Sequence, residues 1–153
     1  MIPSDLWQLP NPFIELWQVP PEVIDHYGHV NNVAYISQIE KLAWAHSNAL
    51  GLSIEQYQEL DRGMAIRRHE VDYLLACHEG DTIACATWIV ACDKRLTLSR
   101  RFQFICATRS KTVFTAKTDF ICIALSSGMP KRMPEPFKQA YGGAMIVPVQ
   151  EQG

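Results

Sequence analysis

A stretch without Gly or Pro runs from Ala34 to Leu50, and it sets the shape that the rest of the chain must cover. Its apolar residues recur at the three- and four-residue intervals of a helix and form a wide apolar face. We therefore predict one long helix that is buried on more than one side. Asn32 is its predicted N-cap, and Gly51 is expected to end it.

A second, shorter helix is predicted to follow. Ser53 can cap it, and Gln56 lies three residues later in the capping-box position. We expect this helix to end between Asp61 and Gly63.

The remaining periodicity is that of β-strands. Alternating apolar and polar residues or strand-favouring side chains predict strands over residues 13–19, 65–73, 82–91, 95–107 and 112–125. Short turns make the last three strands an antiparallel meander. The order of elements indicates an α+β domain, with one long helix against an antiparallel sheet of about five strands. Because such a sheet leaves open edges, we expect a homo-oligomer, a homodimer or a homotetramer.

Length and composition are those of one ordinary globular domain spanning residues 1–153, with a core over about 13–137. The formal net charge is −2 and the basic residues are scattered, so we expect no nucleic-acid partner. The N-terminal residues lack a basic and then apolar pattern, and no apolar run has the length of a membrane span, so neither a signal peptide nor a membrane partner is expected. The tail from Ser126 is rich in Pro and Gly, and its last few residues are expected to be mobile.

The cysteines are odd in number and none are spaced as Cys-x-x-Cys. They lie within apolar or alternating segments, which predicts small buried side chains in a reducing compartment, and hence a cytoplasmic protein.

The loop before the long helix concentrates polar chemistry. It runs from Asp25 to Tyr35 as Asp-His-Tyr-Gly-His-Val-Asn-Asn-Val-Ala-Tyr, with Glu40 further along. A helix N-terminus offers unpaired N–H groups that can stabilise an oxyanion, and a carboxylate beside them can attack a carbonyl or deprotonate water. Residue types alone also fit a plain turn and helix cap, because Asp, Gly and Asn favour both.

A family resemblance bears on this choice. The string Asp-x-x-Gly-His-Val-Asn-Asn-x-x-Tyr, from Asp25 to Tyr35, resembles the signature of hotdog-fold acyl-CoA thioesterases of the 4-hydroxybenzoyl-CoA thioesterase type. It is also similar to plant acyl-carrier-protein thioesterases from His29 to Tyr35. Residues 70–73 with 80–81, and residues 128–135, resemble the second strand and the C-terminal tail of the family.

The resemblance implies a hotdog fold, in which the sheet wraps around the long helix, and hydrolysis of an acyl-CoA or acyl-carrier-protein thioester. It places the catalytic carboxylate on Asp25, as nucleophile or general base, and the N–H that polarises the carbonyl on Asn32. His29 is then a supporting or proton-handling residue. The predicted substrate-binding residues are Gly28, Asn31, Tyr35 and Glu40. Tyr27 stands where the plant enzymes have an Asn, which weakens the analogy with their mechanism.

Two other functions stay open at this point. One is a hotdog dehydratase, which acts on acyl thioesters with a His and a carboxylate; the other is a non-catalytic acyl-thioester-binding protein. The chain has no Gly-x-Ser-x-Gly motif, which argues against the α/β-hydrolase type of thioesterase.

We expect no metal site, because His26 and His29 lack further ligands at recognisable spacing. No cofactor is expected beyond the coenzyme A of the substrate. The basic pairs at 67–68, 94–95 and 100–101 are candidates for binding its phosphates, or are simply solvated strand faces.

Overall fold

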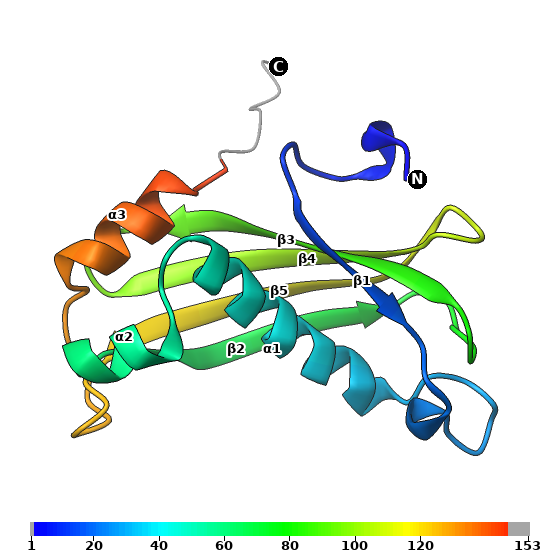
Figure 1. Ribbon diagram of the computed structural model, residues 1–153, viewed down its shortest axis with the longest axis horizontal. Helices are drawn as coiled ribbons and strands as arrows, with labels where there is room; N and C mark the ends of the chain where they lie inside the picture. Colours follow the sequence, from blue (N-terminus) through cyan, green and yellow to red (C-terminus); the bar gives the residue numbers. More distant parts are fainter. Residues whose placement is uncertain (1, 147–153) are drawn as a thin grey trace.

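A curved antiparallel sheet packs against one long helix in the computed structural model, which describes residues 2–146 (Figure 1). The sheet has five strands in the order β1-β3-β4-β5-β2. Their bounds are β1 Phe13–Gln18, β2 Gly63–Tyr73, β3 Thr82–Cys92, β4 Thr97–Cys106 and β5 Lys111–Ile123. The predicted strands and the meander are confirmed, with β1 and β2 as the two edges.

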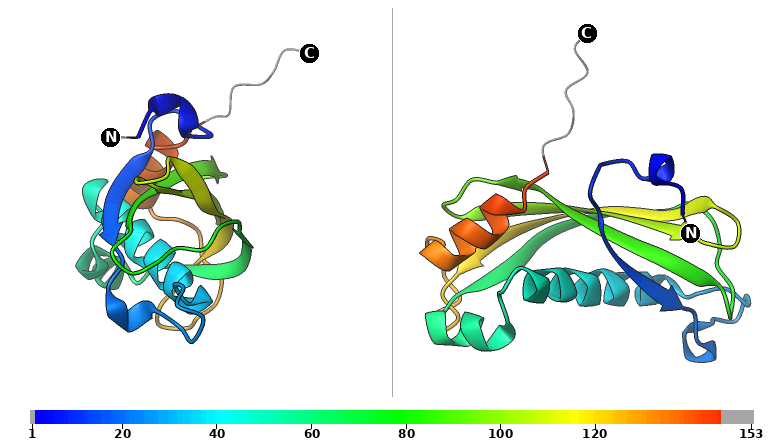
Figure 2. Two further views of the ribbon diagram at one scale, coloured as in Figure 1. Left: turned by 90° about the vertical axis from the view of Figure 1, so that its right-hand side faces the viewer. Right: turned by 45° about the horizontal axis from the view of Figure 1, so that its top comes forward.

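Helix α1 (Asn32–Ala49) lies along the concave face of the sheet, and the sheet curls around it when viewed end-on (Figure 2). The side of α1 that faces the sheet is apolar, as the helical spacing predicted, and includes Tyr35, Ile39 and Leu42. These residues pack on apolar side chains of β3, β4 and β5. The hydrophobic core therefore lies between α1 and the sheet.

Helix α2 (Ile54–Leu60) begins with the predicted capping box. The Ser53 side chain accepts a hydrogen bond from the Gln56 N–H, and the Gln56 side chain accepts one from the Ser53 N–H. Asp61, with a φ of 52°, ends the helix in the left-handed conformation.

The tail contains a helix that the sequence analysis did not predict. Residues Glu135–Gly143 form helix α3, which covers the end of the core beside α2 (Figure 1). Pro134 precedes the first turn, where a missing N–H costs nothing, and Phe137 and Tyr141 are buried. Packing of these two aromatic residues thus outweighs a local sequence that favours turns. The last few residues, expected to be mobile, lie outside the described residues.

The N-terminal segment packs on the opposite face of the sheet from α1 (Figure 2). The Trp88 indole N–H donates to the Pro10 carbonyl at 2.9 Å, and the Gln103 side chain bonds both to the Leu6 carbonyl and to the Gln8 N–H. Within residues 2–146 no helix is both long and apolar enough to span a membrane.

Candidate active site

The loop that carries Asp25 is folded into a tight turn. Ile24 and Val30 form an isolated antiparallel bridge, and the Asp25 N–H donates to the His29 carbonyl at 2.8 Å. The Asp25 Oδ1 atom accepts hydrogen bonds from the Tyr27 N–H at 2.9 Å and from the His29 N–H at 3.3 Å. Within residues 2–146, the Oδ2 atom has no hydrogen-bond partner. The loop thus fixes the carboxylate through one oxygen and leaves the other available for chemistry.

Gly28 makes this turn possible. Its φ of 78° lies in the left-handed region that side chains other than Gly rarely adopt. The Gly28 N–H also donates to the Asp25 carbonyl at 3.1 Å. Its predicted contact with substrate stays a prediction.

The first turn of α1 is held by Asn31, which corrects the predicted N-cap by one residue. The Asn31 backbone is extended, its Oδ1 atom accepts from the Ala34 N–H at 2.9 Å, and its Nδ2 group donates to the Val23 carbonyl at 3.0 Å. Asn31 therefore ties the segment before Asp25 to the start of the helix. Its predicted role in substrate binding stays a prediction.

Asn32 is the first residue of α1 and is exposed. Its carbonyl accepts a hydrogen bond from the Tyr73 hydroxyl at 3.1 Å. A backbone N–H at this position has no partner inside a helix, so it keeps a free donor and a share of the positive end of the helix dipole.

A second loop, residues 74–81, lies against the first. The Val30 N–H donates to the Cys77 carbonyl at 2.9 Å, and the His29 and His78 rings are 5.1 Å apart, edge to face. Asp81 accepts from the His78 N–H at 2.9 Å.

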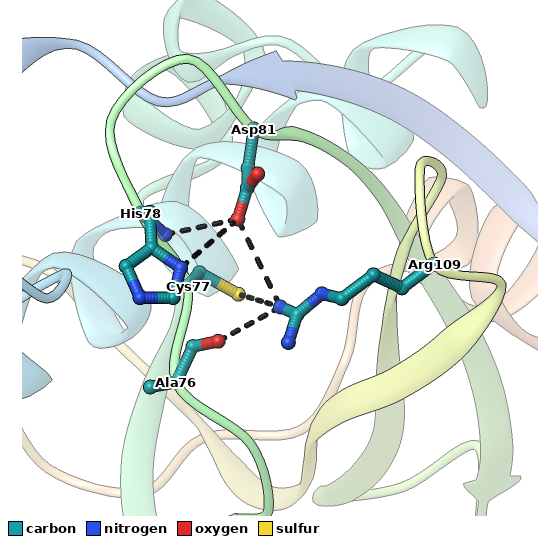
Figure 3. Close-up of polar contacts among 5 residues, drawn as sticks. All are labelled: Ala76, Cys77, His78, Asp81 and Arg109. Atoms are coloured by element: carbon teal, nitrogen blue, oxygen red, sulfur yellow. Dashed lines mark hydrogen bonds and ion pairs between the residues drawn. The ribbon is translucent and has the colours of Figure 1, made fainter.

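Arg109, from the turn between β4 and β5, braces this second loop (Figure 3). Its guanidinium donates to the Ala76 carbonyl at 2.8 Å and lies 3.8 Å from the Asp81 carboxylate. The sequence analysis noted Asp81 only as part of a segment that resembles the family, and it assigned no role to His78, Asp81 or Arg109, because these residues meet only through the fold. Together these residues hold the second loop in the position where the His78 ring contacts the His29 ring.

Tyr35 is buried at 3% exposure, among aromatic side chains. Its ring stacks on Phe114 at 5.0 Å and meets Trp17 and Tyr73 edge to face. Burial raises its pKa far above the ordinary value, so the hydroxyl is neutral. The structure gives Tyr35 a packing role beneath the loops; the predicted contact with substrate stays a prediction.

Glu40 lies eight residues beyond Asn32 on α1, about 12 Å along the helix axis. It is exposed and borders a cavity between the second half of α1 and the sheet. The structure therefore groups Asp25, Gly28, His29, Asn31 and Asn32 at one end of α1, and places Glu40 on a separate cavity.

Arg100 corrects an expectation about the basic pairs. It is only 2% exposed and lines the same cavity as Glu40, so it is neither a solvated residue nor a surface ligand for phosphate. The sequence did carry a signal: position 100 falls in phase with the buried Leu98 and Phe102 of β4.

Four of the cysteines are buried and Cys92 is partly buried, so the prediction of buried side chains is confirmed for those four. Cys77 lies in the second loop, and burial raises the pKa of its thiol, so it is a poor nucleophile at neutral pH. Among residues 2–146, no group of three His, Cys, Asp or Glu side chains is arranged to hold a metal ion.

The sequence of residues 19–141 matches the family model of the thioesterase-like superfamily. This match covers most of the chain, including both loops and the whole of α1. The chain therefore belongs to the thioesterase-like superfamily, and the predicted family is confirmed. Comparison with curated protein sequences gives no match.

Solved structures share the fold. A 1,4-dihydroxy-2-naphthoyl-CoA thioesterase from Synechocystis aligns with a TM-score of 0.77 and 18% identity, over 86% of this chain and 96% of that one. A hypothetical protein from Staphylococcus aureus, in complex with CoA, aligns with a TM-score of 0.81 and 18% identity, over 91% of this chain and 89% of that one. The 12:0-ACP thioesterase from Umbellularia californica aligns with a TM-score of 0.78 and 15% identity, over 92% of this chain and 56% of that one. These similarities confirm the predicted hotdog fold.

Proposed function

We propose that this protein hydrolyses an acyl-CoA thioester to a free acid and coenzyme A, with Asp25 as its catalytic carboxylate. The observation that carries the proposal is the state of that carboxylate: two backbone N–H groups hold Oδ1, while Oδ2 has no partner within residues 2–146. The same loop is tied by Asn31 to the first turn of α1. Membership of the thioesterase-like superfamily supports the reaction class.

The chemistry of a thioester suits this equipment. Its carbonyl is electrophilic and thiolate is a good leaving group, so a carboxylate and a fixed N–H donor are sufficient without a triad. The Asn32 N–H would donate to the carbonyl oxygen as negative charge develops on it. His29, beside Asp25, would handle protons or support the loop.

Asp25 can act by two routes, and the atoms and protons balance in each. As a nucleophile, Oδ2 bonds to the carbonyl carbon, the carbon–sulfur bond breaks, thiolate leaves, and water then hydrolyses the mixed anhydride. As a general base, Oδ2 takes a proton from water while the water oxygen bonds to the carbonyl carbon; the carbon–sulfur bond then breaks, and the proton passes from Asp25 to the leaving thiolate. Either route consumes one water and gives one acid and one thiol.

We further propose that the chain forms a homodimer or homotetramer, in which a second copy helps to form the active site. The exposed edge of β2 and the exposed Leu74 and Leu75 after it support this assembly. The carrier is proposed to be coenzyme A, and acyl carrier protein is the alternative to be compared directly.

The test is release of free thiol from short, long and aromatic acyl-CoAs, and from the corresponding acyl carrier protein thioesters. Asp25→Asn keeps an oxygen that can accept from the Tyr27 and His29 N–H groups, so the loop is preserved while the carboxylate is lost. We expect a loss of ~100-fold or more in kcat. Glu22→Gln, an exposed carboxylate three residues earlier, is the control and should keep full activity.

Absence of thiol release from every substrate would contradict the proposal. Binding without turnover would then favour the non-catalytic acyl-thioester-binding protein, and loss or gain of water on the acyl chain would favour a dehydratase. Full activity in Asp25→Asn would make Asp25 a turn residue.

A further inference from the structure

A cavity of about 120 Å³ lies between the second half of α1 and strands β2, β4 and β5. Most of its wall is apolar, with Ile39, Leu98 and Phe102 among the residues that form it. Glu40 and the partly exposed Trp44 lie at its rim. It is thus an apolar chamber that is open to the surface beside α1 and is separate from the loops around Asp25.

The polar part of this cavity is built around Arg100. The Nη1 atom of Arg100 lies 2.8 Å from His46 Nδ1, and Nη2 lies 3.3 Å from Ser47 Oγ. Within residues 2–146, no carboxylate lies within 4.0 Å of the guanidinium, and Nε makes no hydrogen bond. A guanidinium stays protonated in proteins, and a charge that is buried without a counter-charge is unfavourable.

The groups that Arg100 contacts are neutral: the His46 ring, the Ala43 carbonyl, the Ser47 hydroxyl and the Tyr141 ring. His46 accepts the Arg100 hydrogen bond through Nδ1, and burial together with the Arg100 charge lowers its pKa to about 4. Burial raises the pKa of the Tyr57 hydroxyl, which bonds to the Tyr141 hydroxyl. The cavity therefore has one positive charge in its wall with neutral groups beside it, and the carboxylate at its rim, Glu40, is exposed.

We propose that this cavity holds the far end of the acyl group and that Arg100 binds a carboxylate there. The preferred substrates are then acyl thioesters that carry a second, distal carboxylate. A carboxylate supplies the missing counter-charge and accepts charge-assisted hydrogen bonds from a guanidinium, whereas a methyl or hydroxyl end leaves the charge uncompensated. This inference rests on the proposed thioesterase function.

Geometry sets the length of such an acyl group. Asn32 and Ala43, whose carbonyl lies 3.5 Å from Arg100 Nη2, are eleven residues apart on α1, or about 17 Å. An acyl group that spans the two sites in one chain is therefore long, and a shorter one fits if the reacting loop belongs to a second copy. The optimum chain length in the experiment below distinguishes these two arrangements.

The kinetic experiment compares pairs of acyl-CoAs of equal length, one ending in a methyl group and the other in a carboxylate. For the wild type we expect kcat/KM to be at least ~10-fold higher for the carboxylate-ended member of the best pair. Arg100→Met should abolish this preference by lowering only the carboxylate-ended rate. Lys117→Met removes a cation from the opposite face of the sheet, in a neighbouring strand, and should change neither rate.

A binding experiment tests the carboxylate site on the wild type without any need for catalysis. Decanoate and decanol differ only in the end group, and calorimetry should detect decanoate binding at least ~10-fold more tightly. Arg100→Met, if it folds, should bind both equally.

The outcomes separate the two proposals. Decanoate binding through Arg100 without any thiol release would retain the carboxylate site and overturn the thioesterase function. Thiol release with no preference for a distal carboxylate in the wild type would overturn the substrate class proposed here, even if free decanoate binds. Equal binding of decanoate and decanol would overturn the carboxylate site.

Discussion

At the scale of single residues, the proposed role of the Asn32 backbone N–H can be tested, because Asn32 is the first residue of α1. Pro is tolerated at the first position of a helix, and the preceding residue, Asn31, already has the extended backbone that Pro requires. Asn32→Pro therefore removes one N–H donor from an intact helix. We expect kcat for thiol release to fall ~100-fold, the effect of losing one oxyanion donor. The free energy of unfolding should change by less than about 0.5 kcal/mol.

Asn32→Ala is the matched control, because it removes the same side chain and keeps the N–H. It should retain nearly full activity. Equal activity of the Pro and Ala variants would show that this N–H does not polarise the carbonyl, and a parallel loss in both would assign the effect to the side chain.

The titration of His46 is expected to make the stability of the fold depend on pH. Its pKa is lowered from 6.5 to about 4 in the folded protein by burial and then by the Arg100 charge. As pH falls from about 6.5 to about 4, the unfolded chain binds a proton at His46 that the folded chain refuses, so stability is lost in this range. Because part of the ring is screened by water, we expect a loss of about 1 kcal/mol between pH 7 and pH 5.

Urea unfolding of the wild type and His46→Gln at both pH values measures this loss. Gln can still accept a hydrogen bond from Arg100 but does not titrate, so the variant should lose less stability on acidification. Identical losses in the two proteins would mean that His46 is protonated normally in the fold.

At the scale of elements, the cap of α1 links stability to the position of the reacting loop. Asn31→Ala removes both the acceptor for the Ala34 N–H and the donor to the Val23 carbonyl. We expect a loss of about 1 kcal/mol in the free energy of unfolding, together with a loss of activity. Asn31→Asp keeps the acceptor and places negative charge at the helix start, so it should retain most of the stability. Urea unfolding measures the free energy of unfolding of both variants. An Ala variant as stable as the wild type would contradict the role of the cap.

Elements that depend on local sequence were predictable, and those that depend on packing were not. Helix α2 follows from Ser53 and Gln56 alone, and the strands follow from alternation. Helix α3 does not, because the Pro134 and Gly142 signals are those of a turn, and the helix is stabilised by burial of Phe137 and Tyr141 in the core. The N-cap was misplaced by one residue because two adjacent Asn residues have equal propensity, and only the backbone conformation distinguishes them.

The candidate site shows the same division. The loop from Asp25 to Asn32 is contiguous, so its chemistry was visible in the sequence. The support from His78, Asp81 and Arg109 was not, because it comes from two distant turns that meet only in the folded sheet. The burial of Arg100 was visible as a phase in β4, but its His46 and Ser47 partners on α1 were not.

At the scale of the whole molecule, the fold leaves β2 as an edge strand beside the cavity and the start of α1. Exposed apolar side chains cluster there, including Leu74 at 52% exposure directly after the strand. Burial of such a patch against a second copy would remove apolar area from water and satisfy the strand edge. We therefore predict that light scattering gives the mass of two or four chains.

The same assembly should control activity, because a site completed by a second copy is lost when the copies separate. Leu74→Glu is expected to shift the mass towards a single chain and to lower thiol release per chain in step with it, since a buried unpaired carboxylate opposes association. Ile54→Glu, an equally exposed apolar residue on α2, is the control for added charge and should change neither property. A wild-type protein that has the mass of one chain and full activity on dilution would contradict the prediction, and the complete site would then have to lie within one chain, between the Asp25 loop and the first turn of α1.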